Sequence, residues 1–165
     1  MHERLKIIYQ RRSIRQFKAQ PVEPDLIVEL LRAAMAAPSA RDRQPWQFLV
    51  VTDESTRQQL ASEYPNATFA AEAGVVFFIF GEPNGELFDQ DLAAATENLL
   101  IAAAELGLGA CWCGVTTDRR PGLHKITGIP DSLRIVSMIC VGYPAESKPA
   151  RTQYDEKKVT WERLS

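Results

Sequence analysis

One apolar run, from Gly74 to Phe80, constrains the fold of this chain more than any other segment. It offers no polar side chain to water, which is typical of a central strand buried on both faces of its sheet. The stretch from Phe88 to Leu106 is rich in Ala and Leu and contains neither Pro nor Gly, so it predicts a long, mostly buried helix. Gly107 and Gly109 are expected to end that helix. Together these segments indicate a sheet flanked by helices.

The remaining elements follow one another without a regular strand–helix–strand repeat. Residues 13–17 alternate like extended chain, and residues 38–45 form a loop between two prolines. Helices are further expected over residues 2–11, 24–37, 53–64 and 119–127, and strands over residues 46–52 and 134–141. The irregular order predicts the α+β class. The length of 165 residues predicts a single domain over residues 1–165.

Composition and charge exclude several classes of protein. The apolar fraction of 45% and the charged fraction of 24% are typical of a globular domain. No apolar run approaches the ~18 residues of a membrane span, and the N-terminus lacks the apolar stretch of a signal peptide, so a cytoplasmic protein without membrane contact is expected. The net charge is −2, yet residues 1–20 hold six basic side chains and one glutamate. This patch suits a small anion better than a nucleic acid.

The cysteines and histidines do not suggest a metal site. Cys111 and Cys113 lack the second cysteine pair or histidine cluster that a zinc site needs, so no metal is expected. His124 lies in a polar segment and is expected to be exposed. No Ser/His/Asp set, Walker loop or pair of carboxylates stands out. That absence fits an enzyme whose cofactor carries the chemistry.

Three motifs could bind a ligand, and the first is Arg11-Arg12-Ser13-Ile14-Arg15. In extended chain, residues 11, 13 and 15 share one face. Their guanidinium and hydroxyl groups are the hydrogen-bond donors that a phosphate monoester needs. Ile14 can anchor the segment in the core. The alternative is a solvated basic turn.

The second and third motifs offer backbone groups. Residues 38–46, Pro-Ser-Ala-Arg-Asp-Arg-Gln-Pro-Trp, form a stiff loop whose small residues let a planar ring approach the backbone. Residues 107–114, Gly-Leu-Gly-Ala-Cys-Trp-Cys-Gly, can present an amide to an atom on which negative charge develops. The alternatives are a helix-to-strand connection with Trp46 buried, and a helix cap that leads into a buried strand. Cys113 is a weaker candidate for a redox thiol, because thiols in apolar segments are usually inert.

In this order and spacing, the motifs resemble the nitroreductase family of FMN-dependent oxidoreductases. The resemblance spans nearly the whole chain and rests on residues 11–17, 38–40, 44–46, 105–112, 128–130 and 141–146, together with Asn98. It implies a central mixed or antiparallel sheet flanked by helices, in an intertwined homodimer with two FMN sites at the subunit interface. Independently, the spacing of Val159, Trp161 and Leu164 in a polar tail favours docking of that tail on another surface, such as a partner subunit.

The resemblance also assigns FMN contacts at the phosphate end of the cofactor. The phosphate and ribityl groups match Arg11, Arg12, Ser13 and Arg15. The family's tail usually supplies a second basic pair. Here the matching positions are Arg151 and Gln153, so one charge is missing and weaker FMN binding is expected.

At the ring end, the resemblance assigns two segments. The matching residues are Pro38, Ser39, Ala40 and Asp42 of the other subunit, and Cys113 and Gly114, whose backbone amides are expected near flavin N5 and O4. The family often has Asn where Asp42 stands, and a carboxylate contacts the flavin less favourably than an amide.

The activity that the resemblance implies is ping-pong hydride transfer. NADH or NADPH is expected to reduce FMN, and a nitroaromatic, a quinone or a similar small acceptor to reoxidise it, with flavin N5 rather than a side chain carrying the chemistry. Three alternatives stay open: an FMN-binding carrier or sensor without turnover, a dehalogenating or flavin-consuming relative, and a structural dimer that binds an acidic partner through its basic N-terminal patch. No residue chooses between NADH and NADPH.

Overall fold

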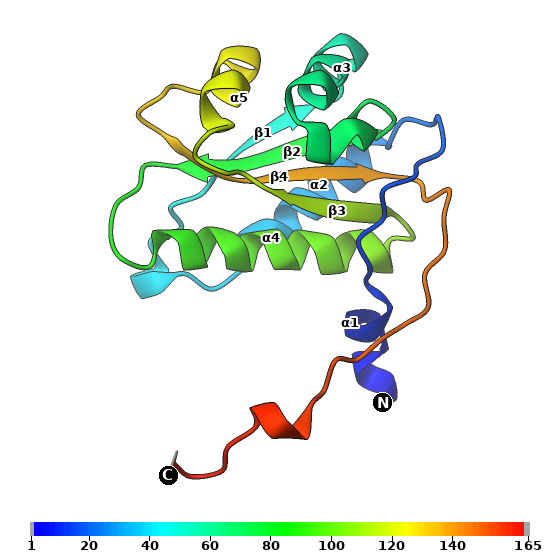
Figure 1. The fold of residues 1–165 in the computed structure, drawn as a ribbon, viewed down its shortest axis with the longest axis vertical. Helices are drawn as coiled ribbons and strands as arrows, with labels where there is room; N and C mark the ends of the chain where they lie inside the picture. The colour runs from blue at the N-terminus through cyan, green and yellow to red at the C-terminus, as the bar shows by residue number, and fades with distance from the viewer. Residues whose placement is uncertain (1, 164–165) are drawn as a thin grey trace.

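A four-stranded antiparallel sheet forms the centre of the computed structural model, which describes residues 2–163 (Figure 1). The strands are β1 (Gln47–Val51), β2 (Val75–Gly81), β3 (Gly109–Gly114) and β4 (Arg134–Gly142), in the order β1-β2-β4-β3. Every residue of β2 is buried, as the apolar run predicts. All three pairings are antiparallel, so of the two predicted alternatives, a mixed or an antiparallel sheet, the antiparallel one is found.

Helices cover both faces of the sheet. They are α1 (Lys6–Gln10), α2 (Pro24–Met35), α3 (Glu54–Glu63), α4 (Phe88–Glu105) and α5 (Arg120–Thr127). Figure 1 shows α4 along one face and α3 and α5 on the opposite face, and α2 packs against α4. The two faces therefore have separate cores, one built around Phe77 and Leu99 and the other around Phe78 and Leu60. This is the predicted α+β arrangement.

Local sequence signals explain where the helices begin. Pro24 stands in the first turn of α2, where its missing N–H is not needed. The Asp53 carboxylate caps α3 by accepting the N–H of Thr56 at 2.7 Å. Gly107, with φ 75°, and the stretch that follows it carry the chain from α4 into β3, as the helix-cap interpretation expects.

One expectation about exposure is wrong. His124 is buried, and its ring Nδ1 lies 2.8 Å from the carbonyl oxygen of Ile129. The polar composition of residues 119–127 favours a solvated segment, but α5 packs against α3 and buries Leu123 and His124. The backbone carbonyl that partners this ring nitrogen makes burial of the imidazole inexpensive.

The C-terminal tail leaves the body of the molecule. After β4 the chain passes α1, where the N–H of Arg151 donates to the carbonyl oxygen of Tyr9 at 2.9 Å, and then extends away (Figure 1). Residues 151–163 are exposed, including Tyr154 and Trp161, whose exposed fractions are 72% and 78%. Leu164, the third predicted docking residue, lies outside the described residues. Among residues 2–163, no helix is long and apolar enough to cross a membrane.

Candidate functional site

The basic segment 11–15 lies against β3, so the first and third motifs meet. Ser13 forms a parallel bridge with Ala110, and the N–H of Ile14 donates to the Ala110 carbonyl at 2.9 Å. Ile14 is buried, as predicted. A Cβ at Gly109 would lie 2.7 Å from the Ile14 side chain, so only glycine lets the two segments approach this closely.

The arginines of this segment have different partners. Arg11 Nε lies 3.2 Å from a carboxylate oxygen of Glu97 in α4, and the Arg12 guanidinium donates to the carbonyl oxygen of Pro149. Within residues 2–163, no ion pair involves Arg15. Arg15 therefore keeps its guanidinium donors for a ligand.

Lys148 is a candidate site residue that the sequence alone did not single out. Its Nζ donates to the Ser13 carbonyl at 2.6 Å and lies 3.1 Å from the Glu146 carboxylate. Glu146 in turn accepts the N–H of Arg15 at 2.6 Å, and this bond, with that from Lys148, holds the pKa of Glu146 below its ordinary value. Lys148 therefore adds a cation beside Ser13 to those of Arg11, Arg12 and Arg15. The only signal for it in the sequence is its position three residues before Arg151.

The two tail residues that the resemblance assigns to the phosphate, Arg151 and Gln153, are both exposed. Arg151 is tied to the segment beside Arg11 only through its backbone bond to Tyr9, and its side chain is exposed. Gln153 is exposed as well. Lys148, which precedes both in the chain, is instead half-buried and bonded to the Ser13 carbonyl.

The loop 38–45 lies at the other end of α4. The N–H of Ala40 donates to the Asp91 carboxylate at 2.9 Å, in the first turn of α4, whereas segment 11–15 contacts Glu97 and the strand that follows α4. Pro38 and Asp42 are exposed, while Ser39 and Ala40 are half-buried. Within one chain, the second motif is therefore not brought together with the first and third (Figure 1).

Asp42 has an unusual backbone and a side-chain partner. Arg41, Asp42 and Gln44 all have positive φ, at 56°, 54° and 49°. The side-chain amide of Gln44 donates to the Asp42 carboxylate at 2.8 Å, so this carboxylate has a partner within the loop. Trp46 is buried at the start of β1.

The thiols behave as buried apolar groups. Cys113 lies on the same face of β3 as Cys111, and Cys111 pairs with Cys140 of β4. The contact with Cys113, followed by burial, raises the pKa of Cys111 far above its ordinary value. For Cys113, Cys111 lowers the pKa, but Cys140 and burial outweigh this and raise it. Gly114 is exposed, and its carbonyl accepts the Tyr64 hydroxyl.

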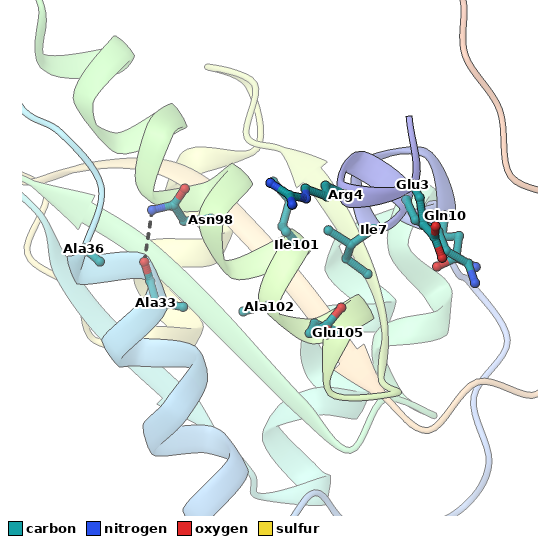
Figure 2. Close-up of a pocket in the computed structure, with 11 residues that line it drawn as sticks. Glu3, Arg4, Ile7, Gln10, Ala33, Ala36, Asn98, Ile101, Ala102 and Glu105 are labelled. Atoms are coloured by element: carbon teal, nitrogen blue, oxygen red, sulfur yellow. Dashed lines mark hydrogen bonds between the residues drawn. The ribbon is translucent and has the colours of Figure 1, made fainter. Parts of the chain in front are cut away.

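A large hollow of the surface lies away from these residues. It encloses about 850 Å³ where α1, α2 and α4 meet, and Ile7, Ile101 and Ala102 form its apolar part (Figure 2). A smaller hollow of about 260 Å³ borders Arg12 and Lys148. The small hollow has the donors for an anion, whereas the large one is an uncovered helix face.

The donor cluster of this region consists of the cationic and hydroxyl side chains of Arg11, Arg12, Ser13 and Arg15, with Lys148 bonded to the Ser13 carbonyl. Donors of this kind are suited to a phosphate group. Within residues 2–163, no group of three or more His, Cys, Asp or Glu side chains could hold a metal ion.

Comparisons with known proteins identify similar proteins of one family. Residues 8–64 and 57–143 match the Nitroreductase family. A protein of Archaeoglobus fulgidus, assigned as an NADH dehydrogenase/NAD(P)H nitroreductase, is 36% identical over 155 residues, which cover 90% of this chain and 89% of that protein. A crystal structure from Parabacteroides distasonis with the same assignment superposes with a TM-score of 0.93 at 34% identity, covering 99% of this chain and 100% of the other. A Desulfovibrio desulfuricans nitroreductase structure in complex with FMN has a TM-score of 0.88 at 27% identity, covering 100% and 99% of the two chains.

Proposed function

Because the chain belongs to the nitroreductase family, we propose that it is an FMN-dependent oxidoreductase that uses NADH or NADPH to reduce a nitroaromatic, a quinone or a similar small acceptor. The observation that carries the proposal is the docking of segment 11–15 on β3, with Lys148 beside Ser13. FMN supplies the hydride and electron transfer when it is bound. The chain supplies binding, orientation and electrostatics.

The donor set fits the phosphate end of FMN. A phosphate monoester carries charged oxygens that need several donors, and charge-assisted hydrogen bonds are stronger than neutral ones. Arg11, Ser13 and Arg15, assisted by Arg12 and Lys148, would hold the phosphate and ribityl groups. Arg151 would approach from the tail. Glu97 and Glu146 orient two of these groups and offset part of the positive charge before the cofactor binds.

The ring end requires a second copy of the chain. The loop with Pro38, Ser39, Ala40 and Asp42 lies beside the first turn of α4, far from segment 11–15 of the same chain. Two copies packed through α4 around a two-fold axis would bring each loop to the other copy's basic segment. The hollow between α1, α2 and α4 supports this arrangement, because its apolar lining lies open in one chain (Figure 2). The homodimer and the cytoplasmic location are both part of the proposal.

At the ring, backbone groups are proposed to act rather than side chains. The amides of Cys113 and Gly114 would lie near flavin N5 and O4, where negative charge develops on reduction. No thiol is proposed to take part, because Cys140 and burial raise the pKa of Cys113 despite the opposite effect of Cys111, and a protonated thiol is a poor nucleophile.

The proposal is tested by an anaerobic visible spectrum of protein that has been incubated with FMN, desalted and titrated with NADH or NADPH. Retained flavin bands that bleach support the oxidoreductase. Bands that persist favour the carrier or sensor, and absence of bands contradicts FMN binding.

The phosphate assignment is tested by Arg15→Ala and Arg11→Ala. Each is expected to weaken FMN binding by at least about tenfold, because a hydrogen bond to a charged group contributes about 1.5–3 kcal/mol. Lys18→Ala is the control, since it removes a cation from the same stretch without touching the cluster. FMN titration by fluorescence quenching measures the dissociation constants. Parent-like affinity in both arginine variants contradicts the assignment.

A further inference from the structure

Asp91, in the first turn of α4, is the only buried carboxylate found among residues 2–163, with an exposed fraction of 8%. Burial of a carboxylate is unfavourable unless polar partners compensate it. The positive end of the α4 dipole lies here and provides part of this compensation. The carboxylate must also receive hydrogen bonds, and the one it receives comes from a distant segment.

That hydrogen bond joins α4 to the loop that carries Ser39 and Ala40. Asp91 Oδ1 accepts the N–H of Ala40 at 2.9 Å, across 51 positions of sequence. The loop's other bonds are internal: Asp42 N–H donates to the Ser39 carbonyl, Arg43 N–H to the Ala40 carbonyl and Gln44 N–H to the Ser39 hydroxyl. The loop is thus folded on itself and attached to the helix through Asp91.

The backbone of this loop needs such an attachment. Arg41, Asp42 and Gln44 occupy the left-handed region, which residues other than glycine rarely adopt. A strained conformation persists only where its surroundings hold it. Pro38 and Pro45 restrict the ends of the loop, and the Asp91 bond holds its middle.

We propose that Asp91 is a positioning residue, which holds the loop 38–44 in the one conformation that receives the flavin ring. This inference rests on the proposed function, because the ring is the ligand that the loop is expected to line. If the loop is released, only a fraction of the molecules has the competent conformation, and the apparent affinity falls by that fraction. Asp91 acts through Ala40 and does not touch the cofactor.

Two substitutions separate the hydrogen bond from the charge. Asp91→Asn keeps an acceptor oxygen of the same reach and removes the charge, whereas Asp91→Ala removes both. Asp89→Ala is the matched control: it lies in the same turn of α4, but its side chain is exposed and pairs with Arg134 at 3.0 Å.

The experiment combines FMN titration with limited trypsin digestion. Asp91→Ala is expected to weaken FMN binding about tenfold, because an unmade buried hydrogen bond is costly. It is also expected to accelerate cleavage after Arg43 relative to cleavage after Arg32, which lies inside α2 and reports global unfolding. Asp91→Asn and Asp89→Ala are expected to resemble the parent in both measurements. The visible absorption of bound FMN should change in Asp91→Ala alone, since a general loss of stability would not alter the environment of the ring.

Parent-like affinity and cleavage in Asp91→Ala overturn the inference, as does an Asp91→Asn variant as defective as Asp91→Ala. If the parent binds no FMN, the proposed function fails, while the digestion still tests the attachment of the loop. If Asp91→Ala does not fold, hydrogen exchange of the parent decides. Slow exchange of the Ala40 amide, comparable with that of the hydrogen-bonded Asp91 amide, supports the attachment, and fast exchange overturns it.

Discussion

Cys113 lies beside two further thiols on one face of the β3–β4 pair. The side chain is buried, and its pKa is raised by Cys140 and by burial, although Cys111 acts in the opposite direction. The thiolate, not the thiol, is the nucleophile and the reducing group. At neutral pH, this cysteine therefore contributes its backbone amide and its volume.

Replacement of Cys113 by Ala should consequently leave the chemistry intact. FMN affinity and the rate of bleaching by NAD(P)H are expected to stay within about twofold of the parent, while the melting temperature falls slightly because a small buried group is lost. Stopped-flow reduction and thermal unfolding measure the two effects. A reduction rate that collapses while FMN remains bound would assign a redox role to the thiol.

At the scale of elements, segment 13–17 is held between β3 and the start of the tail. Ser13 pairs with Ala110, Phe17 pairs with Pro144, and the N–H of Ala145 donates to the Gln16 carbonyl at 2.9 Å. The Glu146 carboxylate links the two sides, because it receives the N–H of Arg15 and pairs with Lys148. The basic segment thus owes its position to an acidic residue of the tail.

This link predicts a dependence on pH. The N–H of Arg15, followed by Lys148, lowers the pKa of Glu146 below the ordinary value of 4.5. The stability that it contributes is therefore present above this value and is lost as the pH falls through the lower pKa of the folded state. Glu146→Gln should be less stable than the parent at about pH 7, and the difference should shrink as the pH falls below 4.5. Thermal unfolding of both proteins across this range measures it, and a constant difference would contradict the role of Glu146.

At the scale of the whole molecule, one chain exposes several large apolar side chains. The hollow between α1, α2 and α4 has an apolar lining, and Leu5, Ile8 and Met35 are also exposed. The tail with Tyr154 and Trp161 extends into solvent. Exposed apolar surface of this kind is what the proposed homodimer would cover.

An Ile101→Glu substitution in the hollow tests the proposed homodimer. The parent is expected to elute as a dimer. The variant is expected to be monomeric, because the glutamate would be buried without a partner in the interface between the two copies. It is also expected to lose FMN, because the flavin ring then lacks the loop that the second copy supplies. Light scattering coupled to size exclusion, with flavin absorbance, follows both. Ser62→Glu on α3, on the opposite face of the sheet, is the control. A dimeric Ile101→Glu variant that retains FMN would refute this interface.

Much of the fold follows from local patterns. The run 74–80 becomes the buried β2 because burial on both faces of a sheet leaves a continuous apolar run. The Ala- and Leu-rich stretch without Pro or Gly becomes α4. Ile14 is buried, as expected of an anchor for its segment, and Trp46 is buried, as the alternative interpretation of the loop 38–46 expects. His124 was misjudged, because the polarity of a short segment does not reveal which of its faces packs on another helix.

What the sequence by itself determined is most of the helices and strands, the family and a motif with donors suited to a phosphate; β3 stood only as one of two interpretations of residues 107–114. Each of these depends on residues that are close together in the chain, so the local order and spacing of residue types is enough to predict it. Only the tertiary structure placed Lys148 beside Ser13, Glu146 on Arg15 and Asp91 under Ala40. These contacts join residues 135, 131 and 51 positions apart. The path of the tail along segment 13–17 and the packing of α4 create them, and neither leaves a local pattern in the chain.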